Sequence, residues 1–141
     1  MKVNIYVYHT IKTPKASEGA YTYILETEIN EKTATLSKSA RFKGPKNHAD
    51  LEVILEALKR MNKPSEIEII GTSNYISNGV SSIPKWEQNN WKTSKGTEVA
   101  NKEEWQQFNE YMKVHTVTVN TSNEHSYSHW MKGEAEKKER E

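Results

Sequence analysis

The sequence has no cysteine among its 141 residues, which excludes disulfide bonds and metal sites built from thiolate ligands. Only 34% of the residues are hydrophobic and the mean hydropathy is −0.92, so the core is small relative to the polar surface. No apolar run approaches the roughly 20 residues that cross a bilayer. The start of the chain, Met1 to Asn4, lacks an apolar leader. We therefore expect a soluble, cytoplasmic protein with no membrane partner.

Neither sign of charge is in excess, because 20 Lys and Arg residues face 19 Asp and Glu residues, a net charge of +1. Proteins that bind nucleic acid strongly through its phosphates usually carry an excess of basic residues. The composition therefore argues against strong electrostatic binding of nucleic acid. A chain of this length suits one domain, and we expect a single domain over residues 1–141.

Alternation of apolar and polar residues predicts the strands of a sheet. Val3, Ile5 and Val7 follow the period of a strand that has one buried face, and Asn30 marks a turn between two further β-rich runs. The first three strands, joined by short links, predict an antiparallel meander. A later strand reached through a helix predicts a parallel crossover. The predicted strands cover residues 3–8, 20–27, 32–39, 66–70 and 113–120.

The segment 47–61 has the apolar spacing of a helix. Its apolar residues recur at i, i+3, i+4 and i+7, which places them on one stripe. Asn47 is expected to cap the first turn of this helix. The stripe consists of Leu51, Ile54, Leu55 and Leu58.

Three of the four tryptophans lie between residues 86 and 105. This stretch predicts a helix, a polar turn and a second helix that Asn101 caps. Because tryptophan is costly to expose, we expect these side chains to anchor the core, with a stacking surface as the alternative. A short helix is predicted over residues 74–81, ending before Pro84, and a short charged helix from about residue 130.

The tryptophan stretch reads Trp-x4-Trp-Lys-Thr and then Val-x-Asn-x3-Trp, which resembles the helix–loop–helix segment of the ribonuclease H family. The resemblance covers about residues 2–138. It implies an α/β fold with a mixed five-stranded sheet, three antiparallel strands followed by parallel strands, and helices on both faces. It also implies RNA–DNA hybrid as a partner, because these enzymes cleave the RNA strand of such hybrids. Further matches lie at Val3–Tyr6, Tyr21–Leu25, Leu55–Leu58 and Tyr75–Val80.

The family places four Asp or Glu residues around two Mg²⁺ ions, which activate water and stabilise the leaving oxygen. The resemblance puts these four positions at Tyr8, Asp50, Thr72 and Lys132. Three of the four carboxylates are missing, and one is replaced by a cation. We therefore expect a degenerate site with no functional catalytic residue and no bound metal. Mg²⁺ or Mn²⁺ would be a cofactor only if a rearranged site were active.

The loop 123–129 offers a different set of ligands. His125 and His129 have a spacing that suits Zn²⁺ when both lie on one face of a helical turn. The alternative, which we favour, is a solvated loop of polar residues.

Four residues are candidates for contacts with nucleic acid: Asn47, Asn74, Trp91 and Lys92. The resemblance implies that amides at the first two positions contact the minor groove, and an amide both donates and accepts hydrogen bonds. A helix cap for Asn47 and a turn residue for Asn74 are the alternatives. Trp91 and Lys92 lie in a segment that is a basic handle in some family members, but Glu87 and its polar neighbours replace the cations here.

Three functions remain open from the sequence. The first, which we favour, is a catalytically inactive ribonuclease H-like domain that binds RNA–DNA hybrid or other nucleic acid weakly. The second is an active metal-dependent nuclease with a rearranged site. The third is an accessory domain that binds a protein partner and has no role with nucleic acid.

Overall fold

The computed structural model describes residues 1–141 and contains one five-stranded sheet with the order β3-β2-β1-β4-β5. The central strand β1 is antiparallel to β2 and parallel to β4, which confirms the predicted mixed sheet. Strand β5 continues the parallel side at the edge next to β4. The strands are β1 (Lys2–His9), β2 (Ser17–Ile29), β3 (Lys32–Gly44), β4 (Glu66–Ile70) and β5 (Thr116–Asn120).

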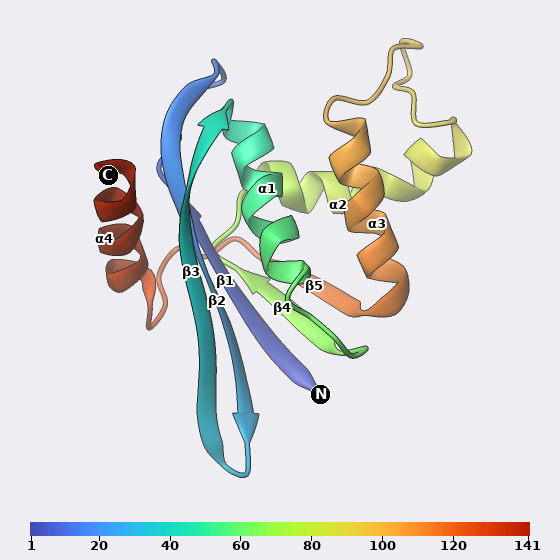
Figure 1. Ribbon diagram of the computed structural model, residues 1–141. Helices are drawn as coiled ribbons and strands as arrows, with labels where there is room; N and C mark the ends of the chain where they lie inside the picture. Colours follow the sequence, from blue (N-terminus) through green and yellow to red (C-terminus); the bar gives the residue numbers. More distant parts are fainter.

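Helices cover both faces of the sheet (Figure 1). Figure 1 shows α1, α2 and α3 on one side and α4 alone on the other, where α4 contacts β1, β2 and β3. None of these helices is long and apolar enough to span a membrane. The helices are α1 (Lys46–Leu58), α2 (Asn74–Gln88), α3 (Lys102–Val114) and α4 (Ser128–Glu139).

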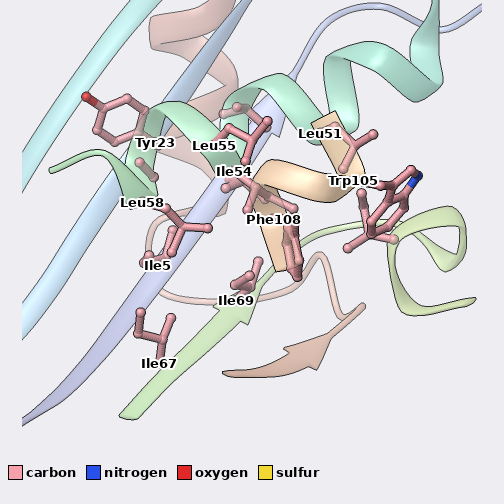
Figure 2. Packing of buried hydrophobic residues seen from close by; sticks show 14 of the residues in the cluster. Ile5, Tyr23, Leu51, Ile54, Leu55, Leu58, Ile67, Ile69, Trp105 and Phe108 are labelled. Atoms are coloured by element: carbon pink, nitrogen blue, oxygen red, sulfur yellow. The ribbon is translucent and has the colours of Figure 1, made fainter. Parts of the chain in front are cut away.

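The larger core lies between the sheet and α1. The predicted stripe of α1 is buried, and Figure 2 shows these side chains close to Ile5 of β1, Ile69 of β4 and Phe108 of α3. Burial of each such aliphatic or aromatic side chain stabilises the fold by about 1.5–3 kcal/mol. This packing fixes the start of α1, and with it Asp50, against the end of β1.

Trp105 is fully buried in this core, as predicted for a tryptophan anchor. Its Nε1–H donates to the hydroxyl of Tyr75 at 3.0 Å, so the one polar atom of the indole is satisfied. Its ring lies against Gly79 of α2, where an added Cβ would be 2.1 Å from a ring carbon. Trp86 and Trp91 are half-buried at the edge of the same core, with their ring centroids 6.0 Å apart.

A smaller cluster on the opposite face holds α4 against the sheet. Met131 of α4 is fully buried against Tyr6, Ile24 and Ile70 of the three central strands. Ala135, one turn further along α4, is also fully buried. The charged helix predicted from about residue 130 therefore begins at Ser128 and packs along the sheet.

The predicted break at Pro84 is wrong, because α2 continues through this residue to Gln88. Proline removes one backbone donor from a helix, which usually ends or kinks it. Here burial of Ile83 and the packing of Trp86 against the core hold the last turn in place. One helix therefore replaces two of the predicted segments.

The predicted cap at Asn47 is wrong, whereas Asn101 takes the predicted N-cap position of α3 without capping the helix through its side chain. Helix α1 begins one residue before Asn47, with Pro45 at the N-cap position and no side-chain cap. Asn101 does precede α3, but its backbone is left-handed, with φ of 58°, and its side chain donates to the hydroxyl of Tyr75 instead. The tertiary contact with Tyr75 therefore takes the amide that the sequence assigned to a local cap.

Several strand boundaries differ from the predicted ones. Strands β2 and β3 pair over 13 residues each, further than the predicted runs, because the two-residue turn at Asn30 and Glu31 has positive φ at both residues. Such a turn matches the twist of the flanking strands and lets pairing continue to its edge. The fifth strand is shorter than predicted, because α3 extends to Val114.

Candidate functional site

A cleft of about 870 Å³ opens where the carboxyl ends of β1 and β4 meet. Parallel strands end at the same edge of a sheet, which is where open α/β sheets usually bind ligands. The first turns of α1 and α2 and the start of α4 complete its walls. The cleft brings together all four positions that the resemblance assigned to the carboxylates: Tyr8, Asp50, Thr72 and Lys132.

Asp50 is only 4% exposed, and each of its carboxylate oxygens accepts hydrogen bonds from the chain. Oδ1 is bonded by Nε2 of His9. Oδ2 accepts from the Ser73 hydroxyl at 2.6 Å and from the Lys46 ammonium at 3.2 Å. The carboxylate is therefore fully engaged within the protein.

The surroundings of Asp50 favour its ionised form. Burial alone would raise the pKa of this carboxyl, but hydrogen bonds from His9 and Ser73 and the positive charge of Lys46 outweigh it, so the pKa lies below its usual range. Asp50 is thus a carboxylate whose charge is balanced by an internal cation.

His9 is fixed as a donor to Asp50. Its Nδ1 accepts the backbone N–H of Ile11 at 3.2 Å, so a neutral ring carries its proton on Nε2. The sequence prediction missed this histidine and Ser73. Lys46 lies at the i, i+4 spacing that signals an ion pair with Asp50 on a helix. His9 and Ser73 lie 41 and 23 residues from Asp50, so no local pattern in the sequence points to their contacts.

The other three predicted positions lack a carboxylate. Tyr8 is half-buried, and the Lys12 ammonium lies 5.3 Å from the centre of its ring. Thr72 is 7% exposed, and its hydroxyl makes no hydrogen bond within the chain. Lys132 is exposed on the first turns of α4 and forms no salt bridge.

Both histidines of the loop 123–129 line the cleft, but they do not share a helical turn. His125 precedes α4, and its Nδ1 accepts the backbone N–H of Tyr127 at 3.2 Å. The His125 ring packs on Tyr6 with centroids 4.7 Å apart, so it is not the solvated side chain that the loop composition predicted. Burial lowers its pKa, which favours the neutral ring. His129 lies on the first turn of α4.

The residues of the cleft do not suit the Mg²⁺ ions that the resemblance implies. Mg²⁺ is a hard cation that keeps several water ligands, and proteins hold it through one or two carboxylates that are free to coordinate. Asp50 is the only carboxylate at the four positions, and His9, Lys46 and Ser73 already occupy its oxygens. No group of three or more His, Asp or Glu side chains in the chain is arranged to hold a metal ion.

Asn47 and Asn74 flank the cleft on the first turns of α1 and α2. Each follows a residue that lines the cleft, Lys46 in one case and Ser73 in the other. Both amides are exposed and make no side-chain hydrogen bond, and the cap of α2 is Ser73. Their amides are therefore unpartnered and lie next to the cleft in sequence, although neither residue lines it.

Trp91 and Lys92 lie away from the cleft, in the segment that joins α2 to α3. Trp91 is half-buried and borders a separate hollow that also contains Glu87, Glu103 and Glu110. Lys113 is paired with Glu110, and the two remaining carboxylates of the hollow repel phosphate. The structure thus divides the predicted nucleic-acid residues between two surfaces.

Comparisons with known proteins agree with this architecture. Residues 3–135 match the family model described as RNase H. A ribonuclease H from Caldicellulosiruptor saccharolyticus is 39% identical over 82 residues, which are 57% of this chain and 57% of that protein. The match therefore spans little more than half of the relative's length.

Solved structures share the fold at low sequence identity. LC9-RNase H1, described as a type 1 RNase H with the type 2 active-site motif, has a TM-score of 0.77 at 16% identity, covering 95% of this chain and 70% of that one. A foamy viral protease–reverse transcriptase in complex with RNA/DNA hybrid has a TM-score of 0.70 at 13% identity, covering 98% of this chain and 20% of that one. Because the family model matches residues 3–135 of the 141 residues, the chain belongs to the ribonuclease H family.

Proposed function

We propose that this protein is a catalytically inactive ribonuclease H-like domain that binds RNA–DNA hybrid or a related nucleic acid weakly. The proposal separates two properties that family enzymes combine. Binding needs a surface that fits a nucleic-acid strand, whereas cleavage also needs two metal ions at the scissile phosphate.

The observation that carries the proposal is the state of Asp50. Its carboxylate is buried, and His9, Lys46 and Ser73 donate to its oxygens. To bind a metal ion, Asp50 would have to give up these partners, and none of the other three predicted positions supplies a carboxylate. The three missing carboxylates and the internal ion pair thus support the same conclusion.

Support for nucleic acid as the partner comes from the shared fold and from the rim of the cleft. One solved relative of this fold holds an RNA/DNA hybrid. In this chain the free amides of Asn47 and Asn74 flank the cleft, and such groups suit 2′-hydroxyls and base edges. The net charge of +1 supports weak rather than tight binding.

The test is a cleavage assay on a labelled RNA–DNA hybrid with Mg²⁺ or Mn²⁺, with an active ribonuclease H as the positive control. We expect no cleavage above background, because no metal pair forms at the scissile phosphate. Metal-dependent cleavage that disappears in Asp50→Asn would refute the proposal and establish a rearranged active site. Absence of binding to hybrid, duplex and single strands alike would instead favour the accessory domain with a protein partner.

A further inference from the structure

We propose that the cleft binds one phosphodiester group directly, without a metal ion, through Thr72, His125 and Lys132. The inference rests on the proposed function and specifies how the nucleic acid is bound there. In a metal site, carboxylates bind the phosphate through bridging cations. Here, protein donors would bind the phosphate directly.

Thr72 supplies the first donor. The residue is only 7% exposed and lines the cleft. Its hydroxyl has no hydrogen-bond partner within the chain. The hydroxyl is not sealed inside the protein, so it is open to the cleft and can donate to a group bound there. A phosphate oxygen in the cleft could accept a hydrogen bond from this hydroxyl. A valine of the same shape could not donate one.

His125 supplies the second donor. Because Nδ1 accepts from the backbone of Tyr127, the neutral ring carries its proton on Nε2. This Nε2 has no acceptor within the chain and lies beside Gly71, 3.4 Å from where a Cβ would stand. Gly71 immediately precedes Thr72, so the two unpartnered donors lie at neighbouring positions on the same wall.

Lys132 supplies a positive charge that no acid of the protein neutralises. The lining as a whole contains three lysines and four carboxylates. Asp50 is paired with Lys46, and Glu139 accepts from Thr10 at 3.0 Å. The remaining charges of the lining are two cations and two carboxylates: Lys12, Lys132, Glu124 and Glu136.

With three lysines and four carboxylates, the lining carries a net charge of −1. Acids at Tyr8, Thr72 and Lys132 as well would make it far more negative and would repel a phosphate strongly. The amino end of α2 adds a favourable field on the same wall. Thr72 and Ser73 lead directly into this helix of 15 residues, whose first backbone N–H groups have no partner inside the helix.

The experiment measures binding of a short labelled RNA–DNA hybrid by fluorescence anisotropy, with EDTA or with Mg²⁺ at constant ionic strength. We expect equal affinity in the two conditions. Thr72→Val should weaken binding about fivefold, the equivalent of one hydrogen bond. Thr72→Ser, which restores the hydroxyl, should bind like the wild type.

Lys132→Gln should weaken binding about two- to fivefold and reduce the slope of log affinity against log salt by about one. The matched control is Lys137→Gln, which makes the same charge change on the same helix at an exposed position outside the lining of the cleft. Thr116→Val, at an exposed position of β5, controls for loss of a hydroxyl elsewhere. Thermal melts of every variant confirm that each is folded.

Three results would overturn the inference. Binding that EDTA abolishes would show that a metal ion holds the phosphate. Binding that is unchanged in both Thr72→Val and Lys132→Gln would place the nucleic acid elsewhere and leave the proposed function intact. Absence of any binding by the wild type would refute the proposed function together with the inference.

Discussion

Asp50 retains a carboxylate, but each side chain that contacts it is a donor. His9, Ser73 and Lys46 come from β1, the loop before α2 and the preceding turn of α1. An unpaired buried carboxylate would destabilise the fold, so these contacts stabilise the buried charge of Asp50. Removing one donor should therefore cost stability.

His9→Ala should lower the free energy of unfolding by about 1–3 kcal/mol near neutral pH, because one oxygen of a buried carboxylate loses its partner. The pKa of Asp50 is lower in the folded protein than in the unfolded chain. The ionised carboxylate therefore stabilises the fold at pH values above the ordinary Asp pKa, and this stabilisation is lost as the pH falls through the pKa of the folded state. Urea denaturation measures the change.

Lys46→Ala, which removes a 40% exposed partner of the same carboxylate, serves as the comparison and should cost no more than about 1 kcal/mol. Equal and negligible effects of both substitutions would show that the carboxylate does not depend on these donors. In that case Asp50 would be free to bind a cation.

Among the elements, those with a strong period were predicted well. The stripe of α1 and the alternation of β1 are properties of a few neighbouring residues, and burial follows from them directly. The continuation of α2 through Pro84 was not predictable, since it depends on packing against residues far along the chain. The contact of His9 with Asp50 was missed for the same reason.

The packing of α2 on α3 depends on a glycine. In Gly79→Ala the new methyl group would lie 2.1 Å from the ring of Trp105, so one helix must shift. We expect a loss of about 1–3 kcal/mol in unfolding free energy, as for overpacked cores. The matched control is Gly133→Ala in α4, where nothing lies within 4 Å of the new atom.

Because alanine favours a helix over glycine, Gly133→Ala should gain about 0.5–1 kcal/mol. Urea denaturation of both variants gives the comparison. Gains of similar size in the two variants would mean that the contact between Gly79 and Trp105 does not constrain the helices.

For the whole molecule, the sheet order and the resemblance together led to a cleft that contains Tyr8, Asp50, Thr72 and Lys132, and the structure brings all four there. What the sequence could not supply was the hydrogen bonding inside the cleft. The missing carboxylates could be read from the sequence. That protein donors bind the one remaining carboxylate, Asp50, could be seen only in the structure.

Thermal melts with and without millimolar Mg²⁺ or Mn²⁺ show whether the cleft binds a divalent metal ion. The comparison protein combines Tyr8→Asp, Asp50→Glu, Thr72→Asp and Lys132→Asp. Four acids in one cleft repel one another, so a bound cation should raise the melting temperature of this variant by several degrees. A version that leaves Lys132 unchanged and relies on Glu136, which lines the cleft one turn further along α4, controls for the register of this helix.

We predict that the wild type shows no shift in melting temperature when the metal is added, while the restored variant does. Equal shifts in the two proteins would contradict the loss of the metal site. They would show that the wild-type cleft binds the metal as tightly as the variant with four carboxylates does.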